Sequence, residues 1–354
     1  MKNTMKISYI YPDKMDPQMK RVVESLKQYE VYKKYGIIVQ EYSYPEIDLK
    51  NIILNSDLIY IISGYASNSE LMLLRKLSNY LTQSTPPLIY GLHNPLFPYY
   101  IYRPKLLFFV FRSLLRYFLL NNIRRRSKLF IHVLNTFEYN LSIKLGFNAF
   151  LIPPGVDTQL FKPSKKYDEF TIFFSGLSYR KGADVVLNII SALDKIQYFK
   201  ARFIITYGAV VLPELLHELK KVQYKIKNIN MEIYDFLSRE KTAEIISKSH
   251  ILLFPSKLET WGRVVLESVS SGTPVIGFDI PGAMHDVVKR FGCGYAIKPF
   301  STKTLLRKIL DMYITYRTKP SYFLELQQIC RKIGLMYDEE ILFRKYISVL
   351  KSII

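Results

Sequence analysis

The fold is decided by the stretch Phe254-Pro255-Ser256-Lys257-Leu258-Glu259-Thr260-Trp261-Gly262-Arg263-Val264-Val265-Leu266-Glu267-Ser268. An apolar run, residues 250–254, leads into it, and the pattern predicts a buried strand, a loop and then a helix that opens at about Gly262. The first amides of a helix lack intrahelical partners and carry the positive end of its dipole, so this turn suits a diphosphate. Gly262 has no side chain and lets a ligand approach the backbone closely.

Two glutamates flank the predicted helix start. Glu267 lies about five residues into the helix, near enough to accept two hydrogen bonds from a ribose diol. Glu259 lies in the loop before the helix, where it can touch a sugar. In an arbitrary protein two such residues are most often solvated surface carboxylates, so their surroundings must decide between the two interpretations.

Short strand-like runs alternate with helical patterns along the rest of the chain. The strand candidates of the first half are Lys6–Tyr11, Gly36–Tyr42, Leu58–Ser63, Pro87–Leu92, Leu129–Leu134 and Ala149–Ile152. Those of the second half are Phe170–Ser175, Arg202–Tyr207, Asn230–Tyr234, His250–Phe254 and Pro274–Phe278. Such alternation predicts an α/β fold with parallel sheets.

A break in this alternation divides the chain. It consists of Ile152-Pro153-Pro154-Gly155 and the polar stretch Lys162–Glu169. We expect an N-terminal acceptor-side Rossmann-like domain over residues 1–155, a C-terminal nucleotide-sugar-binding one over 156–335, and a helix over 336–354 that packs back on the N-terminal domain. Ligands bind beyond the carboxyl ends of parallel strands, so two doubly wound domains facing across a cleft would hold their ligand in that cleft.

The quoted stretch resembles the E-x7-E signature of family 4 glycosyltransferases, which are retaining enzymes of the glycosyltransferase group 1 type with the GT-B fold. Their pattern is close to P-S-x-x-E-x-F-G-x-x-x-x-E-x-x-x-x-G-x-P-V, and Trp261 replaces its usual Phe. The matching residues, all in register, are Pro255, Ser256, Glu259, Gly262, Glu267, Gly272, Pro274 and Val275. Matches at this many fixed spacings make the resemblance specific.

Two further blocks match the family in its order along the chain. Residues 152–161, which run from Ile-Pro-Pro-Gly-Val-Asp to Phe, resemble its I-P-N-G-V-D-x-x-x-F element, with Pro154 in place of Asn. Residues 173–182, Phe-Phe-Ser-Gly-Leu-Ser-Tyr-Arg-Lys-Gly, resemble its F-x-G-R-L-x-x-x-K-G loop. The resemblance is weaker in the N-terminal half, where the Lys-x-Gly-Gly loop of glycogen synthases is absent.

The resemblance implies that Lys181 binds the phosphates of the donor. A cation there neutralises charge that grows on the leaving diphosphate. The Arg that the family has in this loop falls on Gly176, so that Arg180 or Arg263 is expected to supply the missing charge. Without the family context, an Arg-Lys pair of this kind is as readily a solvated turn.

The resemblance also implies further donor contacts and one sugar contact. At the helix start the expected donor-binding residues are Trp261, Gly262, Arg263, Val264 and Glu267. The family commonly has His at the strand end that Tyr90-Gly91-Leu92-His93-Asn94 forms here, which implies that His93 lies near the transferred sugar and hydrogen-bonds or polarises it. A lone His at a strand end is otherwise more often structural, and we interpret His132 as a packed core residue.

The charge of the chain points to an anionic partner. Its formal net charge is +20, and residues 71–137 contain no Asp or Glu. Residues 102–128 place Lys105, Arg112 and Arg116 on one face of a predicted helix among Leu and Phe, which suits an anionic membrane surface. The alternative is a core-packed helix with a solvated basic face. Nucleic acid is not expected, because no RNA or DNA motif accompanies the charge.

Location follows from what the sequence lacks. Residues 1–6 lead straight into a strand and lack the apolar core of a signal peptide. The apolar segment 106–120 falls short of the ~20 apolar residues that span a bilayer. Cys293 and Cys330 have no metal-binding spacing. We therefore expect a cytoplasmic protein, attached peripherally to the inner face of the membrane.

The expected function is transfer of a hexose, with retention, from a UDP- or GDP-linked donor to a membrane- or lipid-linked or glycan acceptor, in glycan or glycolipid assembly. Glu259, Lys181 and His93 are the expected catalytic residues. No cofactor is expected, nor a metal, since the chain has no Asp-x-Asp to hold Mg²⁺. Two alternatives stay open: a nucleotide-sugar epimerase of the GT-B fold, and a non-catalytic basic protein that binds membrane or RNA.

Overall fold

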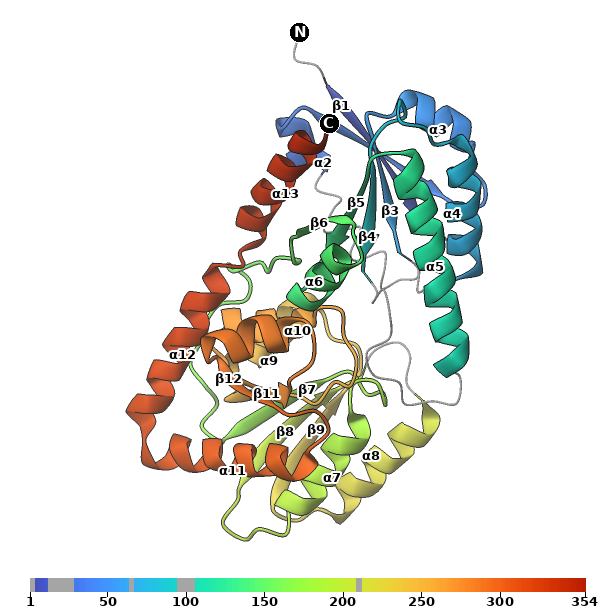
Figure 1. Ribbon diagram of the computed structural model, residues 1–354. Helices are drawn as coiled ribbons and strands as arrows, with labels where there is room; N and C mark the ends of the chain where they lie inside the picture. Colours follow the sequence, from blue (N-terminus) through green and yellow to red (C-terminus); the bar gives the residue numbers. More distant parts are fainter. Residues whose placement is uncertain (1–3, 12–28, 64–66, 94–105, 208–211) are drawn as a thin grey trace. The chain divides into compact units, whose positions relative to one another are not determined.

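The chain forms two compact units, which are described separately. The computed structural model describes residues 4–11, 29–63, 67–93, 106–207 and 212–354. The N-terminal unit contains residues 1–153 and 344–354, and the C-terminal unit contains residues 154–343 (Figure 1).

The N-terminal unit is built on a six-stranded parallel sheet with the order β2-β1-β3-β4-β5-β6. Its strands are β1 (Met5–Tyr11), β2 (Ile37–Ser43), β3 (Leu58–Ile62), β4 (Leu88–Leu92), β5 (Leu129–Val133) and β6 (Asn148–Leu151). Its helices are α2 (Tyr29–Lys34), α3 (Leu49–Asn55), α4 (Asn68–Tyr80), α5 (Leu106–Arg126) and α6 (Thr136–Lys144). The strand order reverses between β1 and β3, and ligands bind beyond the strand ends at such a point.

Burial explains why these runs form central strands. Every residue of β3 and of β4 is buried, as expected of parallel strands that are covered on both faces. The apolar side of α4, which carries Leu73, Leu74 and Leu77, is fully buried against this core. Ser67 caps the start of α4 by accepting a hydrogen bond from the backbone N–H of Glu70 at 3.1 Å.

The C-terminal unit contains a second six-stranded parallel sheet with the order β12-β11-β10-β7-β8-β9. Its strands are β7 (Thr171–Ser175), β8 (Ala201–Thr206), β9 (Ile229–Tyr234), β10 (Ile251–Phe254), β11 (Val275–Phe278) and β12 (Gly294–Ile297). Its helices are α7 (Ala183–Leu193), α8 (Pro213–Lys225), α9 (Arg239–Lys248), α10 (Arg263–Ser270), the π-helix η1 (Met284–Lys289), α11 (Thr302–Thr318) and α12 (Pro320–Leu335). Helix α13 (Glu339–Ile353) begins in this unit and ends in the N-terminal one.

The predicted fold class, two doubly wound α/β sheets, is confirmed. Each predicted strand is present, with its ends within one residue of the prediction. The strand β12 was not predicted. It has only four residues, and it starts at Gly294, where an added Cβ would lie 2.0 Å from the carbonyl oxygen of Val275. Glycine lets the two strands pair there, and it also weakens the strand signal of the sequence.

The end of the chain returns to the N-terminal unit. Residues 344–354 belong to that unit, and Tyr346 and Leu350 of α13 are buried. The hydroxyl of Tyr346 lies 2.8 Å from that of Tyr9 in β1. The last helix therefore contributes both apolar area and a buried hydrogen bond to this unit.

One prediction about α5 is wrong. Arg116, expected on an exposed basic stripe with Lys105 and Arg112, is only 1% exposed, and its guanidinium lies 3.8 Å from the buried carboxylate of Glu70. An unpaired buried charge is costly, which explains why this Arg packs against a carboxylate of α4. Arg112 is partly buried, and Lys105 lies outside the described residues.

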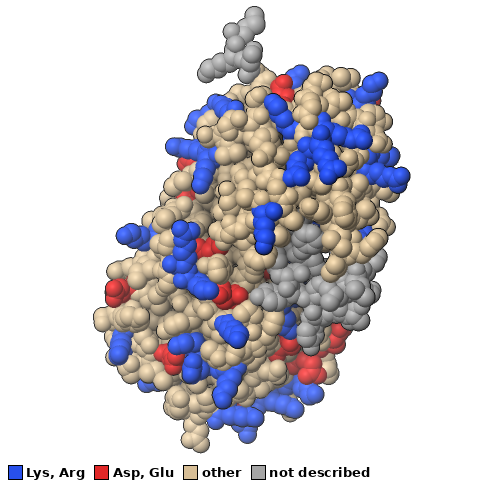
Figure 2. Space-filling view, in the orientation of Figure 1, with Lys and Arg blue, Asp and Glu red and all other residues tan. Residues whose placement is uncertain are grey.

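The exposed part of α5 is apolar instead. Phe111, Leu114, Leu115 and Phe118 are between 39% and 66% exposed, and their spacing of three or four residues puts them on one helix face. Basic side chains lie on both units in the view of Figure 2. Within the described ranges, no helix combines the length and the apolar character needed to cross a bilayer.

Candidate functional site

The turn between β10 and α10 has the geometry that the sequence predicts. Gly262 precedes the first residue of α10 and has φ +87°, a left-handed conformation that favours glycine. An added Cβ there would lie 3.0 Å from the ring of Phe254 at the end of β10. Val265 and Leu266 of α10 are buried and anchor the helix. The first turn of α10 therefore has a fixed position beyond the end of a central strand.

Glu259, in the loop before this helix, is surrounded by hydrogen-bond donors. Its Oε1 accepts hydrogen bonds from Arg180 Nη1 at 2.9 Å and from Ser256 Oγ at 2.8 Å. It also forms a close ion pair with Lys181. Burial alone would raise the pKa of Glu259, but Lys181 and Arg180 outweigh it and hold that pKa below its usual value. This carboxylate is ionised at neutral pH.

The loop that carries these two cations is held against the loop of Glu259. Gly182, next to Lys181, has φ +80°, and an added Cβ would lie 2.2 Å from the carbonyl oxygen of Pro255. The backbone N–H of Lys257 donates to the carbonyl of Arg180 at 2.8 Å. The loop after β7 and the loop after β10 are therefore joined backbone to backbone, which fixes the cations beside Glu259.

Glu267 lies on α10, five positions along the helix, and is partly buried. Burial raises its pKa, and the positive charges of Arg263, Arg239 and Lys181 oppose that rise. Arg239, which was not among the predicted site residues, begins α9, and its guanidinium lies 3.8 Å from the carboxylate of Glu339. No motif marks this Arg, so only the packing of α9 reveals its place.

The remaining predicted donor-binding residues lie at the same turn. Trp261 is 4% exposed, and its Nε1–H has no hydrogen-bond partner among the described residues. Arg263 and Val264 are partly buried at the first two positions of α10. Gly176, where the family Arg is missing, lies close to Lys181: an added Cβ would be 3.2 Å from its Cγ.

His93 follows β4 in the N-terminal unit. Its backbone N–H donates to Ser63 Oγ at 3.0 Å, and its Nε2 lies 3.3 Å from the hydroxyl of Tyr60. Burial, with a smaller effect of His132, lowers the pKa of His93 to about 3. The predicted site residues of the C-terminal unit therefore lie together around the first turn of α10. His93 belongs to the N-terminal unit.

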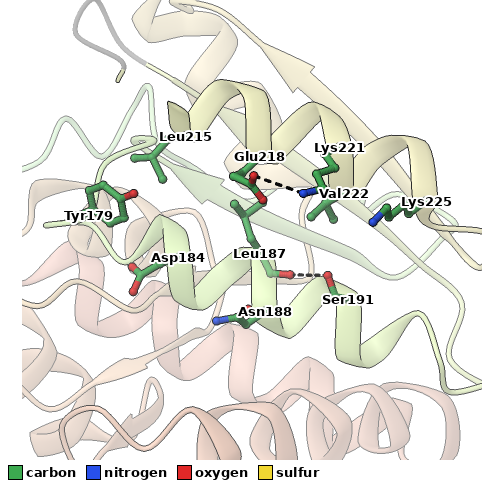
Figure 3. Close-up of a pocket in the computed structure, with 10 residues that line it drawn as sticks. All are labelled: Tyr179, Asp184, Leu187, Asn188, Ser191, Leu215, Glu218, Lys221, Val222 and Lys225. Carbon is green, nitrogen blue, oxygen red and sulfur yellow. Dashed lines mark hydrogen bonds and ion pairs between the residues drawn. The ribbon is translucent and has the colours of Figure 1, made fainter. Parts of the chain in front are cut away.

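A separate hollow of about 350 Å³ lies between α7 and α8 (Figure 3). Two interactions lie within its lining: the carboxylate of Glu218 lies 3.7 Å from the amine of Lys221, and Ser191 Oγ donates to the carbonyl of Leu187 at 2.9 Å. None of the predicted site residues lines it. In the part of the chain that the structure describes, no group of three His, Cys, Asp or Glu side chains is placed to hold a metal ion.

Comparison with known proteins agrees with this geometry. Residues 156–321 match the family model of glycosyl transferases group 1. Over 161 residues the chain is 27% identical to a phosphatidylinositol N-acetylglucosaminyltransferase protein from Arabidopsis thaliana, a match that covers 43% of this chain and 35% of that relative. The chain therefore spans about a third of that relative's length.

Solved structures share the whole fold at low sequence identity. Sucrose-phosphate synthase from Thermosynechococcus elongatus has a TM-score of 0.76 at 15% identity, and the match covers 98% of both chains. HepE of Anabaena, solved in complex with UDP, has a TM-score of 0.71 at 16% identity, with 98% of this chain and 100% of that chain covered. Residues 156–321 therefore match the group 1 glycosyltransferases, and the whole chain has the GT-B fold that these solved structures share.

Proposed function

We propose that this protein transfers a hexose from a nucleoside-diphosphate sugar, UDP- or GDP-linked, to an acceptor with retention of configuration. The observation that carries the proposal is the grouping of Lys181, Arg180 and Glu259 beside the first turn of α10. Two cations and the first amides of a helix suit a diphosphate, and a neighbouring carboxylate suits the hydroxyls of a sugar. The UDP in the HepE complex is a nucleoside diphosphate, the class of molecule that a nucleoside-diphosphate sugar leaves behind after transfer.

In this proposal the donor replaces Glu259 as the partner of the cations. A diphosphate carries more negative charge than one carboxylate, so Lys181 and Arg180 turn to it when it binds. Glu259 then accepts hydrogen bonds from the sugar and orients it. As the bond from the sugar to phosphate breaks, negative charge grows on the leaving diphosphate, and the two cations and the α10 amides stabilise it.

A hydroxyl oxygen of the acceptor attacks the anomeric carbon of the sugar. It attacks from the same face of the sugar from which the diphosphate leaves. Retention then needs no protein nucleophile, because the leaving phosphate guides the incoming hydroxyl and takes its proton. A lipid-linked or glycan acceptor at an anionic membrane surface is favoured by the net charge of +20 and by the exposed apolar face of α5.

The experiment is a calorimetric screen of UDP-, GDP- and ADP-sugars against the full chain and Glu267→Gln. Glu267 is proposed to accept two hydrogen bonds from the ribose, and each hydrogen bond to a charged group contributes about 1.5–3 kcal/mol. We expect one donor class to bind and Glu267→Gln to weaken it at least about tenfold. Glu244→Gln is the matched control, because this Glu of α9 has a 40% exposed side chain that pairs with Lys241 and Lys248 on the surface of its own helix.

Unchanged donor affinity in Glu267→Gln would contradict the ribose role. Incubating the chain with donor alone separates the transferase from the epimerase, since an epimerase releases free sugar in the absence of an acceptor. The proposed transferase requires an acceptor for turnover. Chelation of divalent metals with EDTA is expected to leave its rate unchanged.

A further inference from the structure

The hollow between α7 and α8 is lined by residues of the C-terminal unit (Figure 3). Its volume of about 350 Å³ lies within the roughly 300–1,000 Å³ of small-molecule pockets. Part of its lining is apolar: Leu187 and Leu215 are 8% and 2% exposed, and Val222 is partly buried. A ligand with an apolar face can therefore cover these side chains.

Two uncharged polar side chains in the lining are available to a ligand. Asn188 is exposed on α7, and Tyr179, in the loop after β7, is 38% exposed. Among the described residues, neither the amide of Asn188 nor the phenol of Tyr179 has a hydrogen-bond partner. The amide offers two N–H donors and one acceptor oxygen, and the phenol both donates and accepts. Both groups therefore suit a ligand that carries hydroxyls.

The charges around the hollow cancel, although the chain as a whole has a formal net charge of +20. Its charged lining residues are two acids, Asp184 and Glu218, and two bases, Lys221 and Lys225. A patch that attracts nucleic acid or an anionic lipid has an excess of positive charge, which is missing here. The lining therefore favours an uncharged ligand.

The hollow adjoins both loops of the proposed donor site. Tyr179 directly precedes Arg180 and Lys181, the two cations that pair with Glu259. The carboxylate oxygens of Asp184 accept hydrogen bonds from Lys257 Nζ at 2.9 and 2.7 Å, and Lys257 lies in the same loop as Glu259. A ligand in the hollow is thus held beside the donor turn, within the same unit.

We propose that the hollow between α7 and α8 binds uncharged sugar units of a glycan substrate. A sugar ring has apolar C–H faces and hydroxyls around its edge, which match the apolar side chains and the free amide and phenol. The proposal deepens the proposed function and rests on it for the choice of a carbohydrate as ligand. Because the hollow is separate from the donor turn, it holds the glycan by sugar units other than the one that reacts.

The test is calorimetric titration of the full chain, without nucleotide, with chitotetraose, maltotetraose and cellotetraose. We expect one of these neutral tetrasaccharides to bind. Asn188→Ala and Tyr179→Ala are each expected to weaken it by about fivefold or more, since each removes hydrogen bonds, and Tyr179→Ala also removes aromatic contact area. Tyr198→Ala is the matched control, because Tyr198 is 59% exposed in the same unit and does not line the hollow.

Asn188→Ala keeps the test decisive if Tyr179→Ala does not fold, because it replaces an exposed helical residue by a stronger helix former. Equal binding by Asn188→Ala and the unmodified chain, or no binding of the three tetrasaccharides, would overturn the proposal. Competition by an anionic heparin tetrasaccharide for the same site would also overturn it. Glu267→Gln is expected to bind the neutral sugar like the unmodified chain, so failure of the proposed donor site would be seen separately.

Discussion

At the scale of single residues, Glu259 shows what a sequence motif leaves unsaid. Its Oε1 is shared by Arg180, Lys181 and Ser256. The two cations lie nearly eighty residues earlier in the chain, and only the fold brings them to it. The sequence could predict that these residue types serve one donor, because the family blocks place them. The sequence could not predict that Glu259 pairs directly with Arg180 and Lys181.

Replacement of Lys181 by Met is expected to lower the rate of sugar transfer by about a hundredfold, the effect typical of losing one group that stabilises developing negative charge. Lys241→Met is the control, because this Lys is 48% exposed and pairs with Glu244 on the surface of α9. The measurement is the steady-state rate with the donor found by the binding screen. Equal rates for the two variants would show that Lys181 does not act on the leaving group.

Lys166 provides a pH dependence of stability. Its Nζ donates to the carbonyl of Ser247 at 2.9 Å and to Thr273 Oγ1 at 2.7 Å. Burial lowers its pKa to about 7 in the folded protein. Between about pH 7 and the unfolded pKa of about 10.4 the unfolded chain binds more protons, so this residue makes the free energy of unfolding rise with pH.

We therefore expect Lys166→Met to flatten the increase in the free energy of unfolding between pH 7 and pH 9. Urea denaturation at both pH values measures it. Lys165→Met is the neighbouring control, because Lys165 is 90% exposed. If the free energy of unfolding rises with pH equally in Lys165→Met, Lys166→Met and the unmodified chain, the burial of the Lys166 amine does not contribute to the pH dependence of stability.

At the scale of elements, the predicted strands and helices agree with the structure wherever side-chain patterning alone determines them. Strands β3 and β4 are continuous apolar runs, and all their residues are buried. Arg116 shows the limit: helical spacing groups it with Arg112, but its burial depends on Glu70, which belongs to another helix. Which side of a helix faces the core is a tertiary property, and the pattern of α5, apolar on most sides, does not encode it.

The contact between the loop after β7 and the loop after β10, at Gly182, can be tested by substitution. Gly182→Ala introduces a Cβ that would lie 2.2 Å from a backbone oxygen of the neighbouring loop, in a left-handed conformation. We expect it to destabilise the protein by about 1–3 kcal/mol and to weaken donor binding. Gly36→Ala is the matched control, because Gly36 has φ +71° and nothing within 4 Å of an added Cβ.

Thermal unfolding and donor titration of both glycine variants separate the two effects. Gly36→Ala measures the backbone strain alone and is expected to leave donor affinity unchanged. If Gly182→Ala loses no more stability than Gly36→Ala and binds the donor equally well, the loop after β7 does not need to touch the loop after β10.

At the scale of the whole molecule, charge and the exposed face of α5 together predict binding to an anionic membrane. Phe111 and Phe118 are 66% and 63% exposed on this helix. Fully burying one such side chain contributes about 1.5–3 kcal/mol. We expect the chain to co-sediment with vesicles that contain phosphatidylglycerol, and the double variant Phe111→Ser, Phe118→Ser to bind at least about tenfold more weakly.

Tyr224→Ser is the control for the vesicle experiment, because Tyr224 is a 93% exposed aromatic residue on α8 of the other unit. It is expected to bind like the unmodified chain. Binding should also fall as salt is added, since the charge of +20 contributes. Equal vesicle binding by the double variant and the unmodified chain would remove α5 from the membrane-binding surface.

A crystal structure of the chain with the nucleoside diphosphate of its donor shows directly whether the first turn of α10 binds the phosphates. We expect phosphate oxygens within hydrogen-bonding distance of Lys181 Nζ and of the first backbone amides of α10, and a ribose whose hydroxyls donate to Glu267. Glu259 would no longer be the partner of Lys181. Phosphates bound elsewhere, with Lys181 still paired to Glu259, would contradict it.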